Sequence, residues 1–207
     1  MQIIPVINCP DLACARERAK IASGFSQWVH VDVCDGQFAP VRSWNSPEEL
    51  SLLLGEFPGL SAEVHLMIEE PERHLSEWFE AGAARVVVHW ETLGDHAIAS
   101  KFPGHIIALS TKIETPIEDM LPHLVPDSWV HILAVAPGPA GQRFDPSVTG
   151  KIAVLRERYP ELTIEVDGGI TPETIRFLNG AANIAVSATY IFKNPDPVAA
   201  FRELQTA

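Results

Sequence analysis

Short apolar runs rich in β-branched residues alternate with longer helical stretches along the whole chain, with no linker or low-complexity tract between them. Such runs are typical of strands, and their regular alternation with helix-length segments is typical of βα units on a parallel sheet. The pattern predicts eight strands: Ile3 to Ile7, Trp28 to Val33, Ala62 to Leu66, Arg85 to His89, Ile106 to Ser110, Trp129 to Val135, Thr163 to Asp167 and Ile184 to Ser187.

The segments between these strands carry sequence signals for helix starts. A capping or acidic residue precedes a proline at Ser46-Pro47, Glu70-Pro71, Thr115-Pro116 and Thr171-Pro172. Eight strands that are each followed by a helix can close into a (β/α)8 barrel, here one domain over residues 1–207. An open, doubly wound sheet is the structural alternative, but it normally brings a Gly-rich fingerprint after the first strand, and this chain has none there.

Polar side chains stand near the ends of the second, third and seventh expected strands, where barrel enzymes carry their active residues. Period-two alternation turns His30 and Asp32 into the barrel, and the same rule turns His65 and Asp167 inward. Two imidazoles and two carboxylates suit one divalent ion such as Zn, Fe, Mn or Co and leave positions open for a substrate. Any one of these histidines could be a satisfied core residue, but burying the whole set without a metal or partners would be costly.

Composition narrows the range of partners. The formal net charge is −12, which argues against affinity for nucleic acid or an anionic membrane. No apolar run approaches the roughly 18 residues of a membrane span, and the first residues lack a signal peptide, so a cytoplasmic location is expected. The three cysteines form no CxxC pair, so neither a disulfide framework nor a zinc knuckle is indicated and reduced thiols are expected.

Six segments resemble, in order and spacing, the ribulose-phosphate 3-epimerases: His30 to Pro40, Glu63 to Arg73, Glu80 to Glu91, Pro137 to Ile152, Glu165 to Ile170 and Ser187 to Phe192. The resemblance extends over nearly the whole chain. It implies an isomerase that inverts C3 of a ketose phosphate, with D-ribulose 5-phosphate and D-xylulose 5-phosphate as the expected pair. It also implies a place in the pentose phosphate pathway and assembly as a dimer or a hexamer.

The same resemblance implies roles for the four inward polar residues. His30, Asp32, His65 and Asp167 would bind the metal ion, and Asp32 and Asp167 would also transfer protons on opposite faces of the substrate. Inverting a carbon next to a ketone requires two proton carriers that flank a planar enediolate, so neither carboxylate alone would suffice. A metal ion would stabilise the charge that develops on the enediolate oxygens.

Substrate and phosphate binding are also implied by resemblance, at the first strand end and the turns after strands six, seven and eight. The corresponding residues are Asn8, Gly138, Ala140, Gly141, Gly168, Gly169, Ala188 and Thr189. Glycine lets the backbone approach an anion, but it also makes tight βα turns. For Gly138 and Gly141 the two interpretations stand equal, whereas Gly168 and Gly169 directly follow a candidate catalytic carboxylate, which favours function.

The chain departs from the family pattern mainly at the substrate end. Asn8 replaces the usual Ser, Gln37 the usual His and Ala188 the usual Gly, and the lid reads PGPAGQ where the family has PGFGGQ. Cys34, Met67 and Leu133 occupy the places of the apolar methionines that cover the metal. Cys34 is expected to be a small buried hydrophobe there rather than a nucleophile.

These departures keep two alternatives open besides the pentulose epimerase. One is an epimerase of a hexulose 6-phosphate, of the allulose type, with the same metal and acid/base pair. The other is a non-catalytic descendant that binds a phosphorylated metabolite or serves as an assembly subunit. A phosphosugar decarboxylase is disfavoured, because the second strand lacks the Lys of the Asp-x-Lys-x-x-Asp arrangement.

Overall fold

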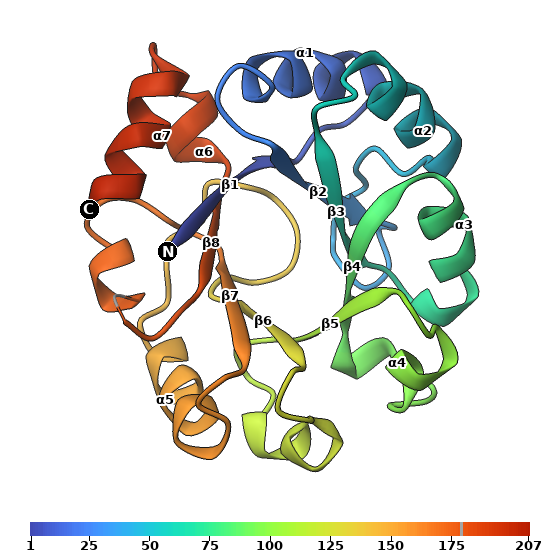
Figure 1. Cartoon of the computed structure of the whole chain (residues 1–207), viewed down its shortest axis with the longest axis vertical. Coiled ribbons are helices and arrows are strands. Elements are labelled where there is room, and N and C mark those ends of the chain that lie inside the picture. Colours follow the sequence, from blue (N-terminus) through green and yellow to red (C-terminus); the bar gives the residue numbers. More distant parts are fainter. Residues whose placement is uncertain (179) are drawn as a thin grey trace.

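A computed structural model describes residues 1–178 and 180–207 and shows a closed barrel of parallel strands (Figure 1). Within these residues eight strands pair in chain order, and β8 closes the ring on β1. The strands are β1 (Gln2–Ile7), β2 (Trp28–Cys34), β3 (Ser61–Met67), β4 (Ala83–His89), β5 (Ile106–Thr111), β6 (Trp129–Leu133), β7 (Thr163–Asp167) and β8 (Ile184–Ser187). The predicted fold class is confirmed, and the strand ends agree with the predictions to within two residues.

Helices surround the ring of strands on its outer side (Figure 1). They are α1 (Leu12–Ala22), α2 (Pro47–Glu56), α3 (Leu75–Glu80), α4 (Ile98–Lys101), α5 (Val148–Arg158), α6 (Thr189–Phe192) and α7 (Pro197–Thr206). The start predicted at Ser46-Pro47 is confirmed, because the Ser46 side chain accepts a hydrogen bond from the backbone N–H of Glu49. No helix in the described ranges is both long and apolar enough to cross a membrane.

At the other three predicted helix starts the chain does not enter an α-helix at the proline, because a 3-10 turn follows Pro71, Pro116 and Pro172. After the first of these turns, α3 begins at Leu75. The 3-10 turns of the described residues are η1 (Pro71–Arg73), η2 (Trp90–Thr92), η3 (Ile117–Asp119), η4 (Leu121–His123) and η5 (Ile175–Leu178), of which η1, η3 and η5 follow the three prolines. After β5, a second proline at position 122 removes a backbone donor. After β7, the hydroxyl of Thr174 donates to the carbonyl of Gly169 and also accepts from the N–H of Thr171, so side-chain bonds compete with the helical ladder.

The two faces of each strand have different surroundings, as the alternation predicted. Val29, Val31 and Val33 of β2 pack in the main core between the strands and the helices. His30 and Asp32, on the other face, are buried inside the barrel. β1 and β8 form a separate apolar cluster of Ile4, Val6, Ile184 and Val186, with Trp28 and Trp129 packed on it.

A buried ion network lies beside this cluster. The guanidinium of Arg85 lies between the rings of Trp28 and Trp129, 4.1 and 4.0 Å from their centroids. It pairs with Glu63 and lies 3.6 Å from an oxygen of Glu165. Two carboxylates inside a barrel need such a cation, because unpaired buried charge is costly. The network thereby fixes the position of Glu63, which also contacts the candidate site described below.

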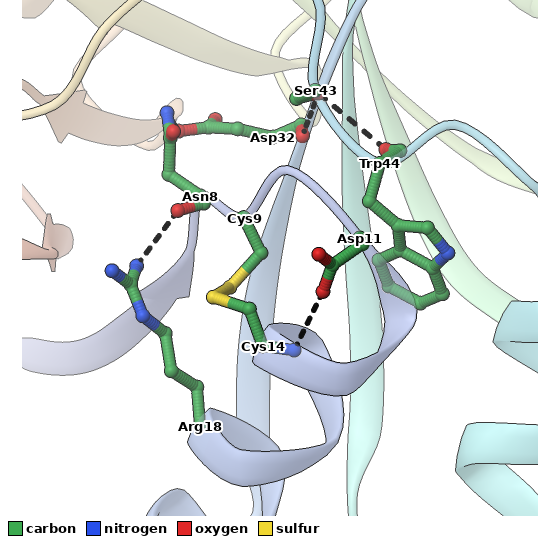
Figure 2. Close-up of a disulfide and its surroundings, with 8 residues drawn as sticks. All are labelled: Asn8, Cys9, Asp11, Cys14, Arg18, Asp32, Ser43 and Trp44. Atoms are coloured by element: carbon green, nitrogen blue, oxygen red, sulfur yellow. Dashed lines mark hydrogen bonds between the residues drawn. A yellow bond between two sulfur atoms is a disulfide. The ribbon is translucent and has the colours of Figure 1, made fainter.

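The expectation of reduced thiols is wrong for two of the three cysteines. Cys9 and Cys14 form a disulfide between the end of β1 and the first turn of α1 (Figure 2). Cys34 is free and buried. Asp11 caps α1 by accepting a hydrogen bond from the N–H of Cys14, which turns the helix start back toward β1. The two Cα atoms lie 5.7 Å apart, a normal separation for a disulfide.

This pairing makes a direct prediction for the thiol count. Denatured without reductant, the protein is expected to show one reactive thiol per chain, from Cys34, and three after reduction. Closing so short a loop should stabilise the fold by about 2 kcal/mol, so reduction or a Cys14→Ser change should lower the free energy of unfolding by that amount. Three thiols in the untreated protein would contradict the disulfide.

Candidate active site

A cavity of about 480 Å³ opens at the carboxyl ends of the strands. The loop that follows β6, yellow in Figure 1, crosses the centre of the ring and contributes to the cavity wall. Most of the predicted site residues line this one cavity: Asn8, Asp32, Met67, Leu133, Gly138, Ala140, Gly141, Asp167, Gly168, Gly169, Ala188 and Thr189. His30 and His65 are fully buried below it, and Gln37 is exposed outside its lining.

The four predicted metal ligands come together. Asp32 Oδ1 lies 3.2 Å from both His30 Nε2 and His65 Nδ1. His65 Nδ1 also lies 3.7 Å from Asp167 Oδ2. Residues from β2, β3 and β7 therefore meet at one point, as expected for inward side chains at neighbouring strand ends.

Each of the two predicted histidine ligands is held by a partner on its other ring nitrogen. His30 Nδ1 lies 2.5 Å from Glu63 Oε1, which leaves Nε2 directed at the cluster. His65 Nε2 lies 2.9 Å from His89 Nε2, which leaves Nδ1 directed at the two aspartates. Partners of this kind orient the imidazoles that bind metal ions in proteins. Glu63 and His89 are thus positioning residues that sequence reasoning did not identify.

The environment of the cluster shifts the pKa values of the two aspartates in opposite directions. Burial raises the pKa of Asp32, but the adjacent imidazoles of His30 and His65 outweigh it and hold that pKa well below its usual value. Burial, and next the charge of Asp32, raise the pKa of Asp167 to about 6. Near pH 6, therefore, Asp32 is ionised while Asp167 is about half protonated. Carboxyls separated in this way are typical of acid/base pairs.

The donor set fits a metal ion. Ligand atoms of His30, His65, His131 and Asp167 all lie within 4.8 Å of one another. Among the residues the structure describes, the buried Nε2 of His30 makes no hydrogen bond, although Asp32 Oδ1 is 3.2 Å away. Burial and the nearby His131 lower the pKa of His65 to about 3, so its imidazole is neutral, as a metal ligand must be. A cation would satisfy the unpaired nitrogen and the carboxylates together.

Asn8 connects the cluster to the loop after β6. Its Nδ2 donates to Asp32 Oδ2 at 2.8 Å and to the carbonyl of Gly138 at 3.3 Å. Its own carbonyl accepts from Arg18 Nη1, and Figure 2 shows the Asn8 and Asp32 side chains adjacent. Asn8 thus contacts a candidate proton carrier directly, and it is bonded next to the Cys9–Cys14 disulfide.

The two glycines after β7 are required by packing as well as by conformation. Gly168 and Gly169 have φ values of 105° and 66°, which favour glycine. A Cβ on Gly169 would come within 2.3 Å of the backbone nitrogen of Phe144, and one on Gly168 within 2.7 Å of Val135. The close approach of the β6 loop therefore explains both glycines without an anion, so they do not by themselves identify a phosphate site.

Of the three residues predicted to cover the metal ion, two line the cavity and one does not. Met67 and Leu133 line the cavity. Cys34 packs with Met67 and Ala39 in a small apolar cluster and does not reach the cavity lining. Burial raises the pKa of the Cys34 thiol to about 12, which suits a packed hydrophobe and not a nucleophile.

Sequence reasoning missed two buried histidines at the site, His131 in the cluster and His89 beside it. Both are fully buried inside the barrel. The alternation that places Leu133 inside also places His131 inside, and Arg85 predicts the same for His89. The alternation of side chains therefore carried the signal for both residues.

A closed parallel barrel whose mouth holds buried imidazoles and two carboxylates around one cavity defines a (β/α)8-barrel enzyme with a candidate metal centre. Sequence comparison identifies the family. Residues 2–192 match the ribulose-phosphate 3 epimerase family, and the chain belongs to that family of isomerases. It is 32% identical to the ribulose-phosphate 3-epimerase of Schizosaccharomyces pombe over 95% of this chain and 89% of the relative. For the Mycobacterium bovis enzyme the values are 33%, 98% and 91%.

Comparison with solved structures supports the barrel fold of the chain but not its reaction. The chain is similar to 3-hexulose-6-phosphate synthase from Salmonella typhimurium, with a TM-score of 0.72 at 16% identity over 100% of this chain and 97% of that one. It is also similar to orotidine 5'-phosphate decarboxylase from Pyrococcus horikoshii, with a TM-score of 0.68 at 18% identity over 98% and 97%. At such identities, reaction type does not transfer with the fold.

Proposed function

We propose that the chain interconverts D-ribulose 5-phosphate and D-xylulose 5-phosphate by inverting C3. The observation that carries the proposal is that Asp32 and Asp167, from strands that are not neighbours in the barrel, line one cavity above a cluster of imidazoles. Two carboxyls at one cavity can serve the two faces of a planar intermediate. The names of the relatives support the same reaction.

In this proposal one aspartate removes the C3 proton and the other delivers a proton to the opposite face. The depressed pKa of Asp32 keeps it in the ionised form that can act as a base, and the pKa of Asp167, raised to about 6, lets it hold a proton to donate. Asn8 holds Asp32 by a hydrogen bond and restricts its rotation. The roles exchange in the reverse direction, because each epimer presents its C3 hydrogen to a different carboxyl.

We further propose that His30, Asp32, His65 and Asp167 hold one divalent ion of the Zn, Fe, Mn or Co type. When bound, the ion supplies Lewis-acid stabilisation of the oxygens next to C3. Glu63 and His89 hold the imidazoles in place, and the neutral ring of His65 needs no proton release. Burial lowers the pKa of His30, but the carboxyl groups of Asp32, Glu165 and Glu63 around the ring outweigh it and hold the pKa well above its usual value. Metal binding should therefore release a proton from His30.

The substrate phosphate would lie at the other side of the cavity, against the backbone of Gly168, Gly169, Ala188 and Thr189. These positions line the same cavity as the aspartates. The exposed Arg143 lines it as well and provides a cation that the sequence reasoning did not consider. The cavity thus offers a polar end for the carbonyl and a second end for an anion.

Hydrogen exchange at C3 tests the reaction. The metal-loaded protein, incubated in heavy water with either pentulose phosphate, is expected to form the other epimer and to place deuterium at C3, both visible by NMR. Exchange with a hexulose 6-phosphate alone would keep the mechanism and change the substrate. If no ketose phosphate is epimerised or exchanges its C3 hydrogen, the result would favour a non-catalytic binding protein.

The position of Ala188 allows a prediction about the affinity for the substrate phosphate. It has φ −99° and ψ −75°, so no backbone strain requires Gly there, and its methyl group occupies the region proposed for the phosphate. Ala188→Gly is therefore expected to lower KM severalfold with kcat nearly unchanged, because the phosphate contact is equal in ground and transition states. Steady-state kinetics on both pentulose phosphates measure this. A KM that rises would show that the methyl group contributes to binding.

Pathway, compartment and oligomeric state are the last parts of the proposal. We propose that the chain works in the pentose phosphate pathway as a single domain in the cytoplasm, and one relative is the cytoplasmic isoform from rice. Disulfides are rare in that compartment, so the thiol count of the purified protein also tests this location. We propose that the chain binds copies of itself, in dimers or hexamers, in addition to the ketose phosphate. Mass measurement in solution distinguishes them from a monomer.

A further inference from the structure

A third imidazole, His131 of β6, lies in the candidate metal site but has no role in the proposal above. It is fully buried, and one of its ring nitrogens lies within 4.8 Å of ligand atoms of His30, His65 and Asp167. Its ring stacks on His30 with centroids 5.7 Å apart, and the centroid of His65 is 4.5 Å away. His131 therefore belongs to the same cluster as the predicted ligands and not to a neighbouring layer.

The orientation of His131 is set by Ser110 on β5. Ser110 Oγ lies 2.9 Å from His131 Nδ1, both residues are fully buried, and they are paired in the β5–β6 register. When Nδ1–H donates to this hydroxyl, Nε2 carries a lone pair. Ser110 thus fixes which nitrogen faces the cluster.

The nitrogen that faces the cluster is unsatisfied. His131 Nε2 is 3.7 Å from Asp167 Oδ2, too far for a hydrogen bond. Across residues 1–178 and 180–207 this buried atom has no hydrogen-bond partner. Leaving a buried polar atom unpaired costs about 1–3 kcal/mol, so its position in a cluster of metal-binding groups requires an explanation.

The three imidazoles share one arrangement. A partner outside the cluster holds one nitrogen of each ring, namely Glu63 for His30, His89 for His65 and Ser110 for His131. In each case the other nitrogen is directed at the aspartates. This is the arrangement by which proteins orient histidine ligands. A core histidine with no ligand role would have no need to direct a bare nitrogen at two carboxylates.

We propose that His131 Nε2 is an additional metal ligand, so that the centre of this chain offers three imidazoles and two carboxylates. The inference rests on the metal site of the proposed function and extends it. More nitrogen donors favour ions such as Zn and Co over Mn, because imidazole suits the former and carboxylate oxygens the latter. The chain should therefore discriminate more strongly against Mn than a site with two imidazoles does.

X-ray absorption on the zinc-loaded wild-type protein counts the imidazoles directly. The expected number is three. In parallel, zinc and manganese affinities are measured by competition with a chromophoric chelator for the wild type, His131→Leu, Ser110→Ala and His74→Ala. His74 is an exposed histidine and serves as the matched control.

Zinc affinity is expected to fall at least about 100-fold in His131→Leu and about 10-fold in Ser110→Ala, with His74→Ala unchanged. Manganese affinity should fall much less in His131→Leu, so the preference for zinc over manganese should narrow. X-ray absorption of the zinc-loaded His131→Leu protein should then count two imidazoles. None of these readouts depends on catalytic turnover.

The outcomes separate this inference from the proposed function. A wild-type centre with two imidazoles, or His131→Leu with unchanged zinc affinity, would overturn the role of His131 and leave the four-ligand site intact. A wild-type protein that binds no transition metal would overturn both. If circular dichroism shows that His131→Leu does not fold, the imidazole count of the wild type decides the question alone.

Discussion

Asp32→Asn and Asp167→Asn are each expected to abolish epimerisation, with kcat falling by about 100-fold to 10,000-fold, the range typical of a lost general acid or base. The amide keeps the size of the side chain but can neither take up nor release the proton at neutral pH. Because inversion needs both carriers, either change alone should suffice. One variant should still exchange the C3 hydrogen of one epimer with solvent, since one carrier remains. Coupled assays and NMR in heavy water measure the two processes separately.

Asp127→Asn is the matched control, because Asp127 is exposed and far along the chain from both carboxyls. Loss of the metal ion could imitate loss of a proton carrier, so metal content is determined for every variant. Full turnover by metal-loaded Asp167→Asn would remove Asp167 from the mechanism. Equal loss of exchange from both epimers in both variants would point to a structural defect instead.

Removal of the metal ion is expected to eliminate activity and to lower thermal stability. The purified protein should contain about one divalent transition ion per chain, and chelation should release it together with protons. At an ion concentration 100 times Kd, binding to the native state alone stabilises the fold by about 2.7 kcal/mol, so the apoprotein should melt at a lower temperature. Elemental analysis and calorimetry measure the two effects.

His65→Ala should bind little metal and show the melting temperature of an apoprotein whether or not zinc is added. The exposed His74→Ala should keep both the ion and its stabilising effect. Restoration of activity by zinc, cobalt or manganese after chelation identifies the ions that the centre accepts. A protein that turns over pentulose phosphates at full rate after complete chelation would refute the metal part of the mechanism.

Local rules were enough to predict the strands and much of the site. The side-chain period of a strand is two, so β2 must place His30 and Asp32 on the face opposite its valines, whatever the rest of the chain does. The carboxyl ends of parallel barrel strands meet at one mouth, which brings His65 and Asp167 to the same place. The Ser46-Pro47 helix start was equally predictable, because the cap is made within one turn.

Other features depend on contacts between distant segments, and only the tertiary structure decided them. The stagger of the strands determines that Ser110 lies beside His131 and that Arg85 pairs with Glu63. The direction in which α1 leaves β1 determines that Cys9 meets Cys14.

After β3 the helix signal led to a 3-10 turn before α3 begins at Leu75. After β5 and β7 the signals led to 3-10 turns, where a further proline and competing side-chain bonds oppose a helical ladder. Alternation determines which face of a strand a residue occupies, and it was sufficient to place the four predicted metal ligands on the inner faces of their strands. Which atoms meet on that face depends on the relative height of neighbouring strands, and no local pattern in this sequence encodes that height.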